Sequence, residues 1–463
     1  MRKKLVIIGA GSAMFTQGIV MDMINKNPGG HKWHLALVDI DEHVLDGVSR
    51  LVKKLFEKKQ ADIELSWSTD RKDVLPGADY VVSTISVGGR RAWEQDVFIP
   101  RKYGINQPVG DTALPGGISR AMRMVPAILE IVKDVEKLCP NAYFFNYSNP
   151  MAIICRAVRK ANYPITGLCI GTVDTEWSIA RFMGYDRSRV TSLAAGINHC
   201  TFMYDFRYDG ENAWPAVRRK LEEVYGKTGD CDDDIGSRIV EKLKRDSGGK
   251  PTDSTFFMGE PFAWSFFMRY GAFPAPGDRH VTEFFPEYFP GGRYYGYTLG
   301  HDVYSFERAV AMGDQIHNEA MEKAFSPEPL DDDFFKRIGG EHEQFTSIVD
   351  SIERDKREIY YMNVQNNGAI PNLPPWAVVE MPVLATATGP KPIILNDYPD
   401  VLASFTAKFL SVIEVTVDAA LKGDRQLMEE AILAGGYISG RKAVVKMVDE
   451  LIKAQINYLP QFR

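Results

Sequence analysis

Short runs of β-branched and aliphatic residues alternate with helical patterns over the first 170 residues, and this alternation constrains the fold most. Each run is bounded by glycine, proline or acidic residues, as is typical of buried strands. The expected strands lie at residues 4–9, 34–41, 78–89, 141–150 and 165–171. The expected helices lie at residues 12–27, 44–59 and 120–138. This alternation predicts an α/β fold with a parallel, doubly wound sheet.

The rest of the chain follows a less regular pattern. Residues 193–206 are strand-like, residues 257–298 are dense in aromatic residues, proline and glycine, and residues 404–453 are helical. A chain of 463 residues is long enough for two domains. We therefore predict one domain at residues 1–170 and a second at residues 171–463.

Composition excludes several classes of protein. The net charge is -6, so the chain lacks the basic excess that nucleic-acid binding favours. Five cysteines are too few for a disulfide framework and are typical of a reducing compartment. Glycine interrupts the first apolar run, so it predicts neither a signal peptide nor a membrane span. We expect a cytoplasmic enzyme with no nucleic-acid or membrane partner.

The sequence GAGSAM at residues 9–14 lies between an expected strand and an expected helix. Closely spaced glycines let the backbone approach a phosphate, and the helix N-terminus supplies N–H donors. Met14 replaces the third glycine of the dinucleotide-binding pattern, so the motif alone also fits an ordinary turn. Asp39 ends the second expected strand, where a carboxylate can bind a ribose diol and repel a 2′-phosphate. Together these features favour NAD over NADP.

Two later loops carry polar residues. The loop at 109–126 contains Asp111 and leads to Arg120 at a helix start, and it can close over a ligand or simply hold an ion pair. The sequence NYSNPM at 146–151 follows an expected strand. Its asparagines can bind a nicotinamide or a sugar, or can form an ordinary turn.

Cys169 and His199 each follow an expected strand. A thiolate and an imidazole together suit a divalent transition ion and leave positions open for substrate oxygens. Either residue alone is more often structural, since most cysteines are small buried apolar residues. The sequence GDRHVTEFFP at 277–286 crowds charged residues beside aromatic ones, which is typical of a carbohydrate site and less typical of a solvated loop.

The order of these motifs resembles glycoside hydrolase family 4, and residues 366–380 (NNGAIPNLPPWAVVE) are similar to that family's C-terminal motif. The resemblance implies an N-terminal Rossmann domain followed by an α+β domain similar to that of lactate and malate dehydrogenases. It also implies a glycosidase that depends on NAD and on a divalent metal, with Mn²⁺ as the first candidate. The second domain would then bind substrate and metal and mediate assembly into a homodimer or homotetramer.

Family 4 implies a redox route to glycoside cleavage. NAD⁺ accepts a hydride from sugar C3, a base removes the C2 proton, the aglycone is eliminated, water adds, and the hydride returns. Such enzymes do not use the pair of carboxylates on which most glycosidases depend. The resemblance assigns the metal to Cys169 and His199. It gives Asp278 as the candidate C2 base, with Tyr270 in reserve.

The chain departs from many relatives after the metal-binding cysteine, where Ile170 stands in place of a leaving-group acid. Asp174 or a metal-bound water is then the candidate acid. The residues expected to bind the cofactor are Gly9, Gly11, Ser12, Phe15, Asp39, Ser86 and Asn146. The residues expected to bind substrate are Arg91, Asp111, Arg120, Asn149, Asn198, Arg279 and His280.

The motif GDRHxxEF is similar to the branches of the family that act on non-phosphorylated α-glucosides and α-hexuronides, and arginine pairs naturally with a uronate carboxylate. The small-molecule substrate is therefore expected to be an α-glucoside, α-galacturonide or α-glucuronide. Two alternatives remain on the sequence alone. One is an NAD-dependent hydroxy-acid or polyol dehydrogenase on the same fold, and the other is a non-catalytic NAD-binding sensor.

Overall fold

The computed structural model describes residues 2–227, 234–246, 259–331, 334, 344–438 and 440–462. Its first half is a parallel sheet in the order β3-β2-β1-β4-β5-β6, which is the strand order of a doubly wound dinucleotide-binding domain. The strands are β1 Arg2–Ile8, β2 Lys32–Val38, β3 Ile63–Ser68, β4 Tyr80–Ser83, β5 Tyr143–Asn146 and β6 Thr166–Gly167. The predicted fold class is confirmed.

The strand β3 was not among the expected strands. Its sequence, IELSWS, is half polar, and none of its residues is fully buried because β3 forms the edge of the sheet. An apolar-run criterion finds the buried central strands and misses such an edge strand.

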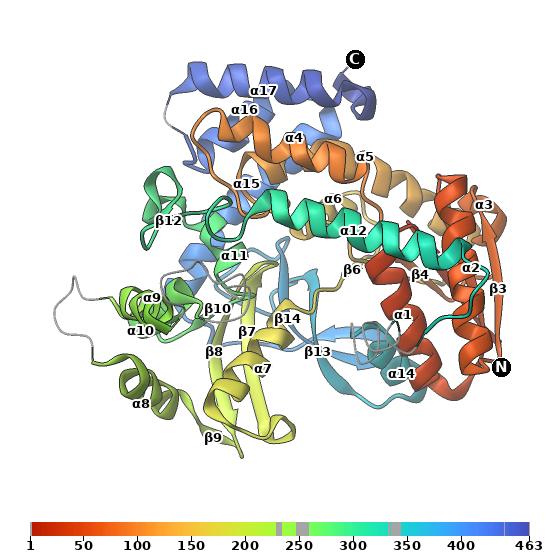
Figure 1. Ribbon diagram of the computed structural model, residues 1–463, viewed down its shortest axis with the longest axis horizontal. Coiled ribbons are helices and arrows are strands. Elements are labelled where there is room, and N and C mark those ends of the chain that lie inside the picture. The colour runs from red at the N-terminus through yellow and green to blue at the C-terminus, as the bar shows by residue number, and fades with distance from the viewer. Residues whose placement is uncertain are drawn as a thin grey trace.

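Helices cover the parallel strands on both faces (Figure 1). They are α1 Ala13–Lys26, α2 Glu42–Lys59, α3 Arg71–Val74, α4 Gly89–Arg101, α5 Leu114–Leu138 and α6 Met151–Lys160. The longest, α5, has a core face of aliphatic residues and packs against α4 and α6. The burial of such faces against a sheet is what holds a doubly wound domain together.

The second half continues the same sheet, with strand pairs that are all antiparallel from β6 onward. Its principal strands are β7 Val190–Ile197, β8 Cys200–Tyr208, β10 Phe273–Ala275, β13 Glu358–Gln365 and β14 Val378–Thr386. The two halves therefore meet along β6 and β13 within one sheet (Figure 1). The domain boundary at residue 170 stays a prediction.

The expected strand at 193–206 is in fact a hairpin of β7 and β8, with Asn198 and His199 in its turn. His199 has a φ of 67°, in the left-handed region that non-glycine residues rarely adopt. An apolar run with a short polar interruption looks like a single strand in the sequence. Only the chain reversal brings His199 to the end of the sheet.

Helices of the second half pack on the first. They are α12 Phe306–Phe325, which contacts α2; α14 Phe345–Arg354, which contacts α1; α15 Asp400–Lys422, which contacts α5 and α6; and α17 Arg441–Gln455, which contacts α4. The helical pattern at 404–453 is divided among α15, α16 Arg425–Ala434 and α17. Figure 1 shows these helices beside the first half. Residues from both halves line the cavity described below.

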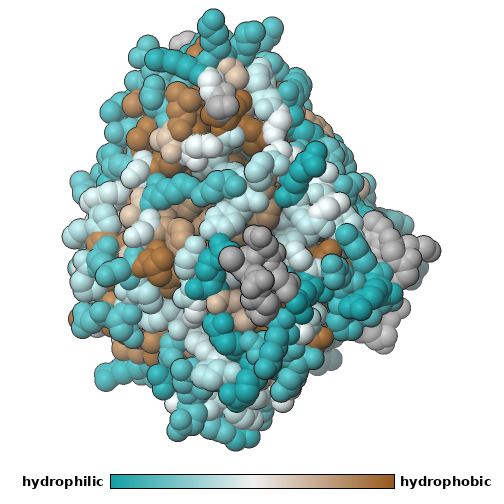
Figure 2. Space-filling model, turned by 90° about the vertical axis from the view of Figure 1, so that its left-hand side faces the viewer, coloured by the Kyte–Doolittle hydropathy of each residue, from teal (hydrophilic) through white to brown (hydrophobic). Residues whose placement is uncertain are grey.

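Within the described ranges, we find no helix whose length and apolar character would let it cross a membrane. The face drawn in Figure 2 is largely hydrophilic, with apolar residues gathered in separate small areas.

Candidate active site

A cavity of about 820 Å³ lies at the carboxyl ends of β1, β2 and β4. Ligands bind at this edge in doubly wound sheets. In the turn after β1, the backbone of Gly9 passes close to the backbone of Ile85. A Cβ atom on Gly9 would lie only 2.7 Å from the backbone nitrogen of Ile85. Gly9 also has a φ of 89°, so the position requires glycine.

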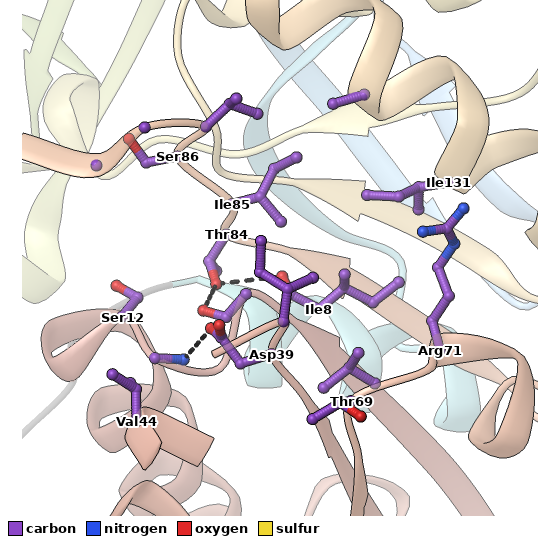
Figure 3. Close-up of a pocket in the computed structure, with 18 of the residues that line it drawn as sticks. Ile8, Ser12, Asp39, Val44, Thr69, Arg71, Thr84, Ile85, Ser86 and Ile131 are labelled. Carbon is purple, nitrogen blue, oxygen red and sulfur yellow. Dashed lines mark hydrogen bonds between the residues drawn. The ribbon is translucent and has the colours of Figure 1, made fainter. Parts of the chain in front are cut away.

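Asp39 is one of the residues that line this cavity (Figure 3). Its Oδ2 accepts a hydrogen bond of 2.7 Å from the backbone N–H of Gly11, and its Oδ1 accepts one of 3.1 Å from the N–H of Asp41. The neighbouring acid Asp41 instead caps α2, where its carboxylate accepts the N–H of Val44. Asp39 is therefore the acid that faces the cavity.

Five of the seven residues expected to bind the cofactor line the cavity: Gly9, Gly11, Ser12, Asp39 and Ser86. The other two lie elsewhere. Phe15 packs its ring 5.2 Å from the ring of Tyr147. Asn146 is fully buried, and its Nδ2 donates to the carbonyl of Ser148, so it holds the turn after β5. Its hydrogen bonds with Ser148 favour the alternative of ordinary turn chemistry, and the predicted contact of Asn146 with the cofactor stays a prediction.

The cavity also contains residues that the sequence analysis missed. Thr84, Ile85 and Val87 follow β4, and Figure 3 labels the first two. Their place at a strand end was a usable signal. Asp314 and His317 come from α12, more than 200 residues away along the chain, and no local pattern pointed to them.

We expect Asp39→Ala to weaken NAD binding by roughly 10- to 100-fold, since a hydrogen bond to a charged group contributes about 1.5–3 kcal/mol. NADP binding should change less, because the substitution removes a carboxylate that repels the 2′-phosphate. Isothermal titration calorimetry of both nucleotides measures this. Asp41→Ala is the control and should leave the NAD Kd nearly unchanged. Equal NAD affinity of Asp39→Ala and wild type would contradict the assignment.

Three potential metal ligands gather beyond the cofactor cavity. Ligand atoms of Asp111, His199 and His280 all lie within 4.8 Å of one another. The rings of His199 and His280 are 4.1 Å apart between centroids. We call these three residues the ligand cluster. The predicted ligand Cys169 is not among these three residues. Its Sγ accepts a hydrogen bond of 3.4 Å from the backbone N–H of Gly171, so its place as a metal ligand stays a prediction.

Thr112 orients His199. Its Oγ1 donates to Asp111 Oδ1 at 2.7 Å and lies 2.7 Å from His199 Nδ1. Because the hydroxyl proton is directed to the carboxylate, Nδ1 of His199 must donate to Thr112, which makes Nε2 the unprotonated nitrogen. Burial lowers the pKa of His199, so the imidazole is neutral. A neutral imidazole with a defined tautomer is the form that binds a metal.

Arg120 connects the ligand cluster to the cofactor cavity. Its Nη2 donates to Ser86 Oγ in the cavity, and its Nε donates to the carbonyl of Asn149. Asn149 Nδ2 in turn donates to Asp111 Oδ2 at 2.9 Å. The predicted contact between Asp111 and Arg120 is thus bridged by Asn149.

Glu283 holds the loop that carries Asp111. Its Oε1 accepts hydrogen bonds from the backbone N–H groups of Val109 and Gly110 at 2.7 and 2.8 Å. Burial raises the pKa of Glu283 to about 8. The two motifs at 109–112 and 277–286, far apart in the sequence, are therefore joined through this side chain.

Two family models together match most of the chain. Residues 4–185 match the family model described as family 4 glycosyl hydrolase, and residues 194–435 match the C-terminal domain of the same family. The chain belongs to glycosyl hydrolase family 4. The prediction of a family-4 glycosidase is confirmed.

Relatives of this family-4 glycosidase differ in their named substrates. The chain is 28% identical to an α-galactosidase of Rhizobium meliloti, over 99% of this chain and 89% of that protein. It is 30% identical to a probable 6-phospho-β-glucosidase of Bacillus subtilis, over 99% and 98%. A crystal structure of a 6-phospho-α-glucosidase from gut microorganisms, with NAD and glucose-6-phosphate, has a TM-score of 0.82 at 22% identity and full coverage of both chains.

A second crystal structure of a 6-phospho-α-glucosidase from gut microorganisms holds NAD and Mn²⁺. Its TM-score is 0.80 at 19% identity, again with full coverage of both chains. Both cofactors named in that complex agree with the cofactors expected for this chain.

Asp278, the predicted base, is fully buried in this glycosidase. Both carboxylate oxygens are buried and accept the N–H groups of Phe262 and Ala263 at 2.7 and 2.8 Å. They thus cap α10 Pro261–Tyr270, and Tyr294 donates a further hydrogen bond. Burial raises the pKa of Asp278 to about 6. These hydrogen bonds give the carboxylate a structural role at the start of α10, and they do not favour the predicted role of Asp278 as the base.

The reserve base and the candidate acid are not among the three residues of the ligand cluster, and their catalytic roles stay predictions. Tyr270 ends α10, the helix whose start Asp278 caps, and its hydroxyl lies 3.3 Å from that of Tyr288. A helix of that length spans about 15 Å. Asp174 is in the first turn of α7 Gly171–Met183, and the charges that lower its pKa against the effect of burial are those of Arg187 and Arg181.

Two predicted substrate residues form other contacts in the structure. Arg91 lines the cofactor cavity and forms ion pairs with Glu94 and Asp314. Asn198 is fully buried, and its Nδ2 donates to Glu380 at 2.8 Å. The predicted contacts of Arg91 and Asn198 with substrate stay predictions. The other predicted substrate residues, Asp111, Arg120, Asn149, Arg279 and His280, gather around the ligand cluster or connect to it.

Proposed function

We propose that this glycosidase cleaves α-hexuronides with the aid of NAD and a divalent transition ion, Mn²⁺ being the first candidate. The connection of the ligand cluster to the cofactor cavity through Arg120 and Ser86 carries the proposal. It allows one sugar to meet both cofactors. The α configuration is suggested by the α-galactosidase named among the relatives.

The donor set fits such an ion. Imidazole, carboxylate and thiol ligands suit borderline divalent transition metals. His199 Nε2, His280 and Asp111 would hold it, with Cys169 as the fourth ligand that the sequence predicts. When bound, NAD supplies a hydride acceptor for sugar C3 and the ion supplies Lewis acidity at the sugar hydroxyls.

The chain's own residues orient these groups. Asp39 and the Gly11 N–H border the cofactor cavity, and Thr112 fixes the tautomer of His199. Asp111 accepts one hydrogen bond on each carboxylate oxygen, from Thr112 and from Asn149. Because a carboxylate has about four acceptor positions, Asp111 can still accept a proton or hydrogen bond from a sugar hydroxyl.

Arg279 favours a uronate over a neutral sugar. Burial lowers the pKa of its guanidinium, and the carboxylate of Asp111 opposes this effect. A guanidinium binds a carboxylate through two parallel hydrogen bonds. The α-glucosides remain the second candidate, since one of the curated relatives is an α-glucosidase.

A panel of nitrophenyl glycosides with NAD⁺ and Mn²⁺ tests the function. We expect release of nitrophenol without net NADH, fastest with α-galacturonide or α-glucuronide. Arg279→Gln should raise KM for the uronide and leave the α-glucoside KM nearly unchanged. Net NADH without nitrophenol would instead indicate the dehydrogenase alternative, and a preference for 6-phosphoglycosides would overturn the substrate assignment.

The expected homodimer or homotetramer stays a separate proposal. Light scattering after size-exclusion chromatography measures the assembly, and a monomeric mass would contradict it.

A further inference from the structure

Glu380 lies at the seam between the two halves of the sheet. It is in β14, in register with Asn363 of β13 and with Gly196 of β7. Asn363 is in turn in register with Gly167 of β6. In Figure 1 these four strands, β6, β13, β14 and β7, lie together in the middle of the molecule. The side chain of Glu380 is 1% exposed.

The carboxylate of Glu380 binds both segments that carry predicted metal ligands. Oε1 accepts a hydrogen bond of 2.5 Å from the hydroxyl of Thr172, three residues after Cys169. Oε2 accepts one of 2.8 Å from Asn198 Nδ2, and Asn198 directly precedes His199. A third donor, Asn363 Nδ2 at 3.2 Å, comes from a strand that carries no predicted ligand.

The three hydrogen-bond donors to Glu380 are neutral, and in the described part of the chain we find no ion pair to this carboxylate. Hydrogen bonds from these donors offset part of the cost of burying the carboxylate. Because Asn198 directly precedes His199, the carboxylate lies close to the ligand cluster. An ionised carboxylate at this place attracts a divalent cation held by the cluster.

We infer that Glu380 is a positioning residue for the metal centre, which holds the Cys169 and His199 segments in register and strengthens cation binding through its negative charge. This inference rests on the proposed metal site at the ligand cluster. Outer residues that hold metal ligands typically change metal affinity by 10- to 100-fold when replaced.

Glutamine can replace Glu380 without loss of packing. In the described structure, Asn198 Oδ1 and Asn363 Oδ1 are buried without a hydrogen-bond partner. If either amide rotates by half a turn, its oxygen accepts from the Nε2 of a glutamine at 380. Glu380→Gln therefore removes the charge and retains the shape and most of the hydrogen bonds.

The test is Mn²⁺ binding to the full-length protein, measured by electron paramagnetic resonance together with NAD binding and thermal unfolding. We expect Glu380→Gln to raise the Mn²⁺ Kd by roughly 10- to 100-fold and to leave the NAD Kd unchanged. Thr172→Val should raise it less, since only the Cys169 segment is released. Glu380→Asp keeps the charge and should fall between wild type and Glu380→Gln.

Asn363→Ala is the matched control, because it removes one hydrogen bond to the same carboxylate but releases no ligand segment. It should lower the unfolding temperature and leave the Mn²⁺ Kd within about threefold of wild type, because the charge of Glu380 remains. If Glu380→Gln does not fold, a comparison of Thr172→Val with Asn363→Ala tests the same role.

Wild-type protein that fails to bind Mn²⁺ would overturn the proposed metal site. Wild-type binding with equal affinity in Glu380→Gln, or an equal loss in Asn363→Ala, would overturn the role of Glu380 alone.

Discussion

Replacing His199 with alanine is expected to reduce kcat/KM for glycoside cleavage by roughly 10³-fold or more, because a lost Lewis acid removes several kcal/mol of transition-state stabilisation. The NAD Kd should stay close to that of wild type, since His199 is not among the residues that line the cofactor cavity. Nitrophenol release and NAD titration measure the two quantities on the same preparation. The Mn²⁺ Kd of the variant should rise in parallel with the loss of activity.

His301→Ala is the control for this experiment. His301 is exposed and belongs neither to the ligand cluster nor to the residues lining the cofactor cavity, so its removal should leave activity and Mn²⁺ binding unchanged. Exhaustive treatment of wild type with EDTA should reproduce the His199→Ala defect, and added Mn²⁺ should restore wild type but not the variant. Full activity of the chelated enzyme would remove the metal from the mechanism.

Arg123→Met is expected to lower the free energy of unfolding by about 3–5 kcal/mol, because it leaves a buried carboxylate without its cation. Arg123 and Asp96 are both 0% exposed and form a bidentate ion pair between α5 and α4. Arg123 also donates to Val87, next to the cofactor cavity, and to Gln455 of α17. Urea unfolding followed by tryptophan fluorescence and circular dichroism measures the change.

Two further variants separate the buried charge from the general loss of an arginine. Arg123→Met combined with Asp96→Asn should recover part of the stability, since the unpaired charge is gone. Arg50→Met removes an exposed i,i+4 ion pair with Asp46 and should change the unfolding free energy by less than about 1 kcal/mol. Equal effects of Arg123→Met and Arg50→Met would show that burial of the pair does not matter.

The cofactor-binding half was largely predictable because its signals are local. Gly9 and Gly11 lie in a single turn between a strand and a helix, and Asp39 ends the next strand. In both segments the local sequence fixes the backbone conformation that borders the cavity. The wall from α12 was not predictable, because Asp314 and His317 reach the cavity only through packing of α12 on α2.

The site residues divide in the same way. His199 was identified from the GINH motif, and its partners Asp111 and His280 were assigned to substrate because nothing in their spacing places them against it. Asp278 has the residue type of a base and lies in the correct motif, yet its carboxylate caps α10. Whether an acidic side chain faces a ligand or a helix end depends on the orientation of its segment in the folded chain.

The sequence by itself determined the parallel α/β half, the dinucleotide-binding turn and the membership of the chain in family 4, because each depends on residues adjacent in the chain or on the order of motifs. The tertiary structure alone decided that both halves share one sheet, with β13 and β14 between the Cys169 and His199 segments. That arrangement places Glu380 against both. Strand pairing over some 200 residues follows from the burial of whole surfaces, and no short stretch of sequence encodes it.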